Sequence, residues 1–98
     1  MYELVLYPPA RKFLKKIKEK GLQNAFEKAF ESLCENPYIG RQKVSDLSGI
    51  YGLDVYYNKT NYEISYRIEE IDGKLVIVIL VGTRENFYKE LKKYLNGV

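Results

Sequence analysis

An arginine directly follows the most hydrophobic stretch of the chain. Residues 75–81 are seven consecutive apolar residues, five of them β-branched, which is typical of a strand that is buried on both faces. Gly82 and Thr83 separate this stretch from Arg84. A rigid strand that presents a guanidinium at its open end predicts a binding site for an anion.

Two further charged residues share one face of the preceding predicted strand. Glu63 and Arg67 are four positions apart, and because side chains alternate between the faces of a strand, both point to the same side. Asp54 falls on the polar face of the neighbouring predicted strand, where Glu63 can lie opposite it. The alternative interpretation is that these three residues form ion pairs on the surface and take no part in chemistry.

The chain contains no histidine and a single cysteine. It therefore lacks the commonest general base, the usual zinc ligand and any Ser–His or Cys–His dyad. Cys34 falls on the apolar side of a predicted helix and has no internal disulfide partner, which fits a reducing cytosol. We expect a cytoplasmic protein that uses no metal and no cofactor. The amino terminus predicts no signal peptide, and the apolar stretch is too short to span a membrane.

The net charge of +3 is unevenly distributed along the chain. Six lysine and arginine residues lie between positions 11 and 20, offset only by Glu19. Such a run is either the solvent-exposed face of an amphipathic helix or a patch that binds phosphates.

Two amphipathic helices are predicted after an opening strand at residues 2–7. Apolar residues recur at helical spacing over residues 10–17, opposite the lysines, and Gly21 is expected to end this first helix. A second helix is predicted over residues 22–36, where an Asn-Pro pair ends the pattern. We expect the two helices to form a hairpin whose apolar stripes pack on the strands that follow.

Three strands and a last helix complete the predicted order β-α-α-β-β-β-α, an α+β fold in one domain over residues 1–98. Residues 38–49 are expected to form a loop with at most a short turn of structure, and the predicted strands cover residues 50–57, 62–69 and 75–81. A turn at residues 58–61 and the hairpin signal at Asp72-Gly73 predict an antiparallel meander. Thr83 is expected to cap a helix that runs to about Leu95. The helical hairpin is expected to cover one face of the meander and to leave a polar row exposed on the other.

This arrangement resembles the RelE/ParE family of toxins from bacterial toxin–antitoxin modules. The likeness is carried by residues 47–51 (LSGIY), residues 62–66 (YEISY), and residues 81–84 (VGTR) with Tyr88 four positions further on. The order of elements and the chain length also match, so the resemblance covers nearly the whole chain. It is the order and spacing of these motifs that is informative, because no single one is distinctive.

The resemblance implies a toxin that is neutralised by a cognate antitoxin. RelE-type members cut mRNA in the ribosomal A site, where the RNA 2′-OH attacks the adjacent phosphate and expels the 5′-oxygen. The favoured expectation is therefore a ribosome-dependent, metal-independent mRNA endonuclease whose partners are the ribosome and mRNA. The alternative is a ParE-like inhibitor of DNA gyrase, or a RelE-fold toxin that binds a protein without cleaving RNA.

The family's site residues match this chain only in part. Arg84 matches the arginine that follows the buried strand, and Tyr88 matches the tyrosine that approaches the nucleotide in RelE-type members. The family has lysines where this chain has Gly52 and Asp54, and an arginine where it has Glu63. Fewer cations near a transferring phosphate predict a slower reaction.

A rearranged site could still support cleavage with fewer cations. Arg67 and Arg84 would hold the phosphate, Tyr88 would position the base or the leaving oxygen, and Glu63 or Asp54 would serve as the general base. The resemblance also favours a role for the basic run in contacting ribosomal RNA phosphates. The candidate contacts are Lys12, Lys15, Lys16, Lys18 and Lys59.

Overall fold

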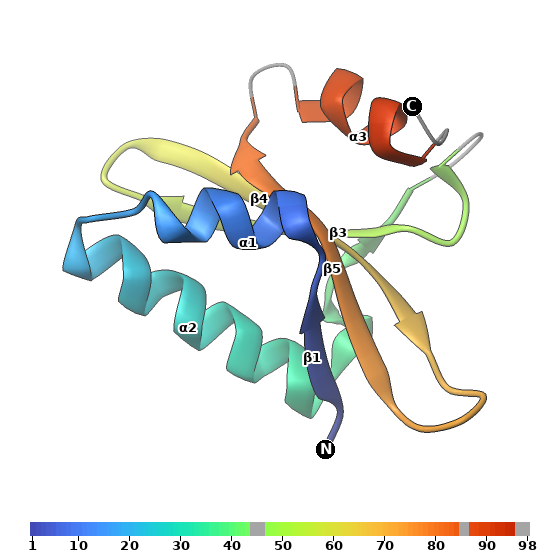
Figure 1. Cartoon of the computed structure of the whole chain (residues 1–98). Helices are drawn as coiled ribbons and strands as arrows, with labels where there is room; N and C mark the ends of the chain where they lie inside the picture. Colours follow the sequence, from blue (N-terminus) through green and yellow to red (C-terminus); the bar gives the residue numbers. More distant parts are fainter. Residues whose placement is uncertain (44–46, 85–86, 96–98) are drawn as a thin grey trace.

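In the computed structural model, which describes residues 1–43, 47–84 and 87–95, β4 is the central strand of a five-stranded sheet with the order β1-β5-β4-β3-β2 (Figure 1). The elements in chain order are β1 (Glu3–Leu6), α1 (Pro8–Lys15), α2 (Lys20–Glu35), the short 3-10 helix η1 (Pro37–Ile39), β2 (Arg41–Gln42), β3 (Tyr51–Tyr57), β4 (Thr60–Glu69), β5 (Leu75–Thr83) and α3 (Phe87–Leu95). The expected α+β order is confirmed, with two additions: η1 at the start of the expected loop at residues 38–49 and β2 within it. Over the part of the chain described, no helix is long and apolar enough to cross a membrane.

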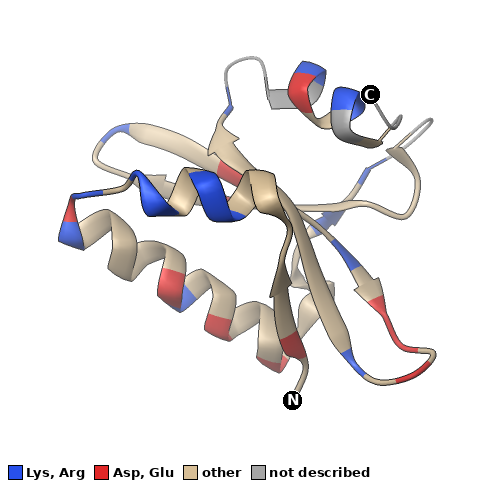
Figure 2. Ribbon diagram, in the orientation of Figure 1, with Lys and Arg blue, Asp and Glu red and all other residues tan. Residues whose placement is uncertain are grey.

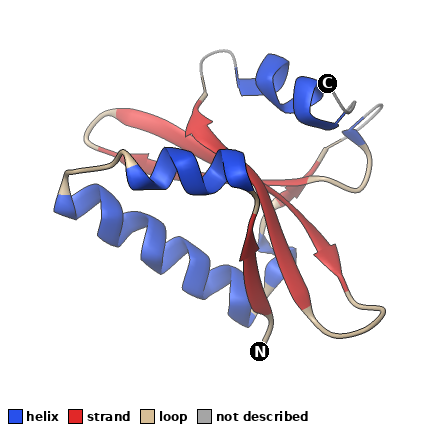
Figure 3. Ribbon diagram, viewed as in Figure 1, coloured by secondary structure: helices blue, strands red, loops and turns tan. Residues whose placement is uncertain are grey.

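The antiparallel meander of β3, β4 and β5 is confirmed by its register. Two short strands extend it. β1 pairs in parallel with β5, with Val5 beside Ile77, and β2 pairs antiparallel with β3, with Arg41 beside Gly52. Figure 3 shows α1 and α2 together on one side of the strands, away from α3. The sheet therefore has one face under a helical hairpin and one face under α3.

β5 carries one residue more than β4 near their middle. Ser65 pairs with Leu80 and Tyr66 with Val78, so Ile79 has no partner in β4 and forms a β-bulge. Because the side-chain period of a strand is two, one extra residue exchanges the faces of all residues beyond it.

The bulge sets the direction of the end of β5. Val76 and Val78 before it pack in the core under the helices, and so does Val81 after it. Leu80 packs on the other face. Arg84, which lies an even number of residues beyond Leu80, therefore continues on the face away from α1 and α2.

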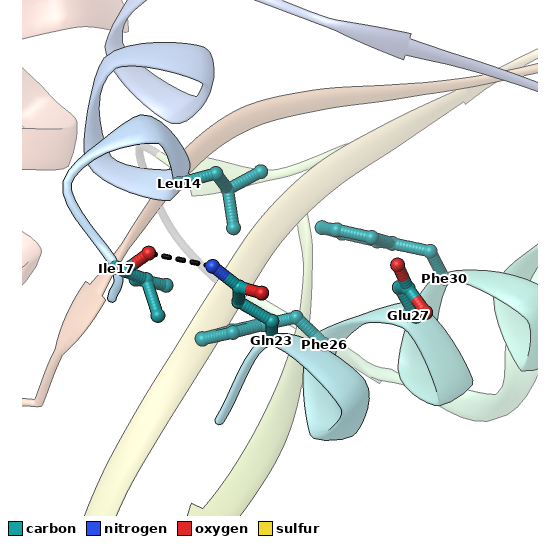
Figure 4. Close-up of a pocket in the computed structure, with 6 residues that line it drawn as sticks. All are labelled: Leu14, Ile17, Gln23, Phe26, Glu27 and Phe30. Atoms are coloured by element: carbon teal, nitrogen blue, oxygen red, sulfur yellow. Dashed lines mark hydrogen bonds between the residues drawn. The ribbon is translucent and has the colours of Figure 1, made fainter. Parts of the chain in front are cut away.

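The larger core lies between the sheet and the helical hairpin. Phe26 is buried against Phe13, Phe30 and Tyr62, with ring centroids 5.6–6.4 Å apart. Each large side chain buried in this way stabilises the fold by roughly 1.5–3 kcal/mol. A hollow of about 210 Å³ remains open between the two helices (Figure 4), lined by Leu14, Ile17, Gln23, Phe26, Glu27 and Phe30.

A smaller core covers part of the opposite face. It consists of Leu47, Ile50, Ile79, Leu80 and Leu91, with Tyr7 and Leu95 packed against it. The expectation of an exposed polar row on this face is wrong at its centre, because Glu63 and Ser65 are fully buried. The segment from Leu47 to Ile50 and the apolar side of α3 supply the apolar cover that the strand pattern alone did not predict.

Two predicted helix boundaries are wrong. α1 ends at Lys15, where Lys16 N–H and Ile17 N–H donate to carbonyls three residues back and tighten the last turn. Gly21 lies inside α2, where any side chain would overlap with the hydroxyl of Tyr57. Glycine is therefore required there for close packing rather than to end a helix. Gln23 Nε2 donates to the carbonyl of Ile17 at 2.7 Å and ties α2 to the connection that follows α1 (Figure 4).

Thr83 is not the amino-terminal cap of the last helix. It is the final residue of β5, and α3 begins at Phe87. The strand extends further than the apolar pattern predicts because Thr83 still pairs with Tyr62, and Arg84 N–H donates to the Asn61 carbonyl at 3.1 Å. Backbone pairing with β4 thus holds Arg84 in the plane of the sheet.

Candidate functional site

Five charged side chains gather on the sheet face away from α1 and α2. This charged cluster consists of Arg41, Lys43, Asp54, Glu63 and Arg84. Its members come from β2, the residue after β2, β3, β4 and the residue after β5. The cluster therefore depends on strand pairing across the sheet and not on any single motif.

Two carboxylates lie directly opposite each other in the cluster. The register pairs Asp54 with Glu63, as expected from the alternation of their strands. Like charges at such a position repel each other. The three cations of the cluster balance this repulsion, each within 4.0 Å of a carboxylate oxygen.

The inner part of the cluster is a buried ion pair. Lys43 Nζ lies 2.8 Å from Glu63 Oε2, and the two side chains keep only 11% and 0% of their surface exposed. Gly52 makes room for this pair, since a Cβ at that position would lie 2.7 Å from Glu63 Oε2 and 2.9 Å from Lys43 Nζ. An ammonium group thus occupies the space above position 52, although that position has no side chain of its own.

The outer part of the cluster surrounds Asp54. Arg41 Nη2 lies 2.8 Å from Asp54 Oδ2, and Arg84 Nη1 lies 3.8 Å from the same oxygen. The Arg84 side chain is 43% exposed, and its Nε lies 3.8 Å from Glu63 Oε1. A carboxylate between two accessible guanidiniums can accept a proton while the guanidiniums bind an anion.

Arg67 is not brought to the cluster. It lies on the Glu63 face of β4 but pairs with Ile77, which places it about 13 Å from Glu63 along the strand. Its Nη2 donates to the Tyr7 hydroxyl at 3.1 Å, and its guanidinium lies 5.8 Å from the centre of that ring. Tyr88 belongs to α3, but the predicted role of its side chain falls outside the described residues.

The predicted ribosome-contacting lysines are all exposed and lie near one end of the sheet. Lys12 and Lys15 are on α1, Lys16 follows its last residue and Lys18 lies in the connection to α2 (Figure 2). The Tyr57 hydroxyl donates to Glu19 at 3.2 Å. This contact places the β3–β4 turn, which carries Lys59, beside that connection.

Sequence reasoning missed Arg41 and Lys43. Both fall in the segment that was expected to be a loop, and β2 contributes only two residues to the sheet. Their spacing of two positions was the available signal, because it places both side chains on one face of an extended segment. In the part of the chain described, no group of three or more Asp, Glu or Cys side chains could hold a metal ion.

A family model describing the ParE-like toxin of type II bacterial toxin–antitoxin systems matches residues 4–92. The chain belongs to this family. It is therefore a toxin of a type II module, and the resemblance stated from the sequence is confirmed. No curated protein sequence matches the chain.

Solved structures of RelE toxins share the fold. In the RelBE2 toxin–antitoxin complex of Mycobacterium tuberculosis, one chain is 26% identical with a TM-score of 0.66, and the match covers 85% of this toxin and 98% of that chain. The intact E. coli RelBE complex gives 22% identity, coverage of 84% and 95%, and a TM-score of 0.68. A double mutant of E. coli RelE in the free state gives 20% identity, coverage of 99% and 98%, and a TM-score of 0.73.

Proposed function

We propose that this toxin is an mRNA endonuclease that acts on translating ribosomes without a metal ion, and that a cognate antitoxin neutralises it. The observation that carries the proposal is the outer part of the charged cluster, where Arg84 and Arg41 flank the carboxylate of Asp54. A base and a pair of guanidiniums are what cleavage by an internal 2′-OH requires. The antitoxin is inferred from the family and from the neighbouring structures, two of which are toxin–antitoxin complexes.

The proposed reaction is a transesterification within the RNA. Asp54, which is 36% exposed, accepts the 2′-OH proton as the 2′-oxygen attacks the adjacent phosphorus. The bond from phosphorus to the 5′-oxygen breaks, and that oxygen takes up a proton from water, which leaves a 2′,3′-cyclic phosphate and a 5′-OH; Asp54 returns its proton to solvent. Arg84 and Arg41 stabilise the charge that builds up on the phosphorane oxygens. Tyr88 positions the nucleotide or the leaving oxygen.

The other predicted residues take different places in this proposal. Glu63 has no exposed surface, so Asp54 is the carboxylate that RNA can reach. Arg67 lies too far along β4 to share a phosphate with Arg84, and we assign it to the RNA backbone beyond the reacting phosphate. The lysines of α1, of its connection to α2 and of the β3–β4 turn contact ribosomal RNA phosphates, which is binding without sequence readout.

The test is primer extension on mRNA after brief expression of the toxin, repeated in vitro with and without translating ribosomes. We expect cuts in phase with codons that appear only when ribosomes translate the message. Asp54→Asn should abolish the cuts while the variant still binds the antitoxin. Cuts that persist in Asp54→Asn would exclude Asp54 as the base, and a message left intact by the wild-type toxin would exclude the endonuclease.

One observation favours a second candidate, a ParE-like inhibitor of DNA gyrase. Two of the three cations in the charged cluster lie only 2.8 Å from the protein's own carboxylates, which leaves less positive charge for RNA than three unpaired cations would. A gyrase inhibitor needs no cleavage site. Purified toxin added to a gyrase supercoiling reaction separates the candidates, because an mRNA endonuclease leaves supercoiling unchanged.

A further inference from the structure

The buried ion pair of Lys43 and Glu63 is not explained by stability. A carboxylate without exposed surface and an ammonium that is nearly covered both lose their hydration, and replacing such a buried pair by apolar residues of similar size is often neutral or stabilising. Gly52 must also remain without a side chain to accommodate them. Because the pair costs hydration energy and requires glycine at position 52, we look for a role that two apolar side chains could not have.

Glu63 has a different partner on each oxygen. Oε2 faces Lys43 Nζ at 2.8 Å, and Oε1 faces Arg84 Nε at 3.8 Å. The Nε edge of Arg84 is thus turned towards the interior of the cluster. Both separations are ion-pair distances and not hydrogen bonds, so Glu63 attracts the guanidinium through its charge. Because the guanidinium is a rigid plane, drawing its Nε edge towards Glu63 also sets the direction of the Nη groups, of which Nη1 lies 3.8 Å from Asp54.

We propose that Lys43 and Glu63 form a positioning pair that aims the guanidinium of Arg84 at the anion bound by the charged cluster. Glu63 supplies the fixed negative charge that orients Arg84. Lys43 neutralises Glu63 from the other side, so that Arg84 keeps its charge for the substrate and is not consumed as the sole counter-ion. The consequence for cleavage rate rests on the proposed endonuclease function, whereas the orientation of Arg84 does not.

The charge reversal at position 63 relative to the family thereby has a physical reason. A carboxylate at this position does not replace a cation of the site, because it is buried below the site and acts through Arg84. Lys43, which reaches over Gly52 from the other side of β3, supplies the second charge that makes a buried Glu63 tolerable. Both residues are positioning residues and neither is proposed to touch the RNA.

The decisive variant removes both charges together. Glu63→Gln alone removes the buried negative charge 2.8 Å from Lys43 Nζ and is expected to lower the melting temperature strongly. Lys43→Met combined with Glu63→Gln removes the whole pair in similar volume, so most of that loss should be recovered. In this double variant kcat for RNA cleavage should fall on the order of 10²-fold with little change in KM, because Arg84 is no longer aimed in the transition state.

Orientation is measured separately from activity. Nuclear magnetic relaxation of the ¹⁵Nε–H group of Arg84, assigned by its loss in Arg84→Lys, reports how freely the guanidinium moves. We expect restricted motion in the wild-type toxin and greater motion in the double variant. Glu69→Gln is the matched control, since Glu69 lies on the same face of β4 at its far end and should change neither Arg84 motion nor kcat.

The outcomes separate the two proposals. If the wild-type toxin cleaves no RNA, the proposed function fails and the relaxation measurement alone decides the positioning role. If Arg84 moves equally in the wild type and in the folded double variant, the positioning role is wrong whatever the cleavage assay shows. Unchanged kcat in a folded double variant of an active toxin also overturns it.

Discussion

The two faces of the sheet bury their side chains by different means. The face under α1 and α2 is filled with interlocking aromatic and aliphatic groups around Phe26. The face under α3 has a smaller apolar core and next to it the charged cluster, with Glu63 fully buried. The first face contributes most of the hydrophobic stabilisation, and the second uses part of its interior to hold charges at defined distances.

The largest effect on stability is expected on the helical face. Phe26→Ala should lower the free energy of unfolding by about 3–5 kcal/mol, because it removes a ring that is 1% exposed and packed between three other aromatic rings. Urea unfolding measures this change. Tyr56→Ala, at a side chain that is 71% exposed, is the control and should stay within about 0.5 kcal/mol of the wild type.

On the other face, a change at Arg84 is expected to affect activity strongly and stability little. Arg84→Ala should reduce mRNA cleavage on the order of 10²–10³-fold, because it removes one of the two exposed guanidiniums that flank Asp54. Its cost in unfolding free energy should be less than about 1 kcal/mol, since the side chain is 43% exposed. Lys28→Ala, on the exposed side of α2, is the control. A cleavage rate equal to that of the control would show that Arg84 takes no part in cleavage.

Gly52 connects stability and charge on the second face. Gly52→Ala should destabilise the toxin by about 1–3 kcal/mol, because the new methyl group meets Glu63 Oε2 at 2.7 Å and Lys43 Cε at 2.9 Å. In a Lys43→Ala background the same substitution should cost clearly less, since one of the two obstacles is gone. A thermodynamic cycle over the four proteins measures this coupling, and strict additivity would show that Gly52 does not make room for the pair.

A third region, remote from the charged cluster, should show pH dependence. Glu70 accepts hydrogen bonds of 2.5 Å from the hydroxyls of Tyr2 and Tyr38. These bonds, that from Tyr2 first, lower the pKa of Glu70, and the bond to Glu70 raises the pKa of both tyrosines.

The two shifts act at opposite ends of the pH range. Since the Glu70 pKa is lower in the folded state, its contribution is complete above the unfolded pKa of about 4.3 and is lost as pH falls below it. Since the tyrosine pKa values are higher in the folded state, their contribution is complete below about pH 10 and is lost as pH rises. Melting temperatures of wild type and Glu70→Gln should converge at low pH. A constant difference between them from neutral to acid pH would contradict this assignment.

The smallest effect is expected from the exposed lysines. Lys12→Ala and Lys15→Ala should each leave stability within about 0.5 kcal/mol and lower the slope of log binding constant against log salt for ribosome binding by about 1. Sedimentation with ribosomes at several salt concentrations measures this slope. A slope equal to that of Lys28→Ala would show that α1 does not contact the ribosome.

The amino-acid sequence by itself determined the order of the main helices and strands, but not β2 or η1. Alternation along β3 and β4 and helical spacing in α2 are local properties, so they identified the meander, the second helix and the face shared by Asp54 and Glu63. The position of Arg84 beyond a strand buried on both faces followed in the same way. The family resemblance also came from the order of short motifs along the chain, and the family match over residues 4–92 confirmed it.

Only the tertiary structure decided how the charges meet. The bulge at Ile79 turns Arg84 to the face of Glu63, and a bulge depends on how one strand pairs with another and not on its own pattern. Lys43 reaches Glu63 only because β2 pairs with β3 and Gly52 leaves a space between them. Arg67 shares a strand face with Glu63 and yet contacts Tyr7, which β1 brings close by pairing with β5. Such contacts join residues far apart in the chain, and local periodicity carries no information about them.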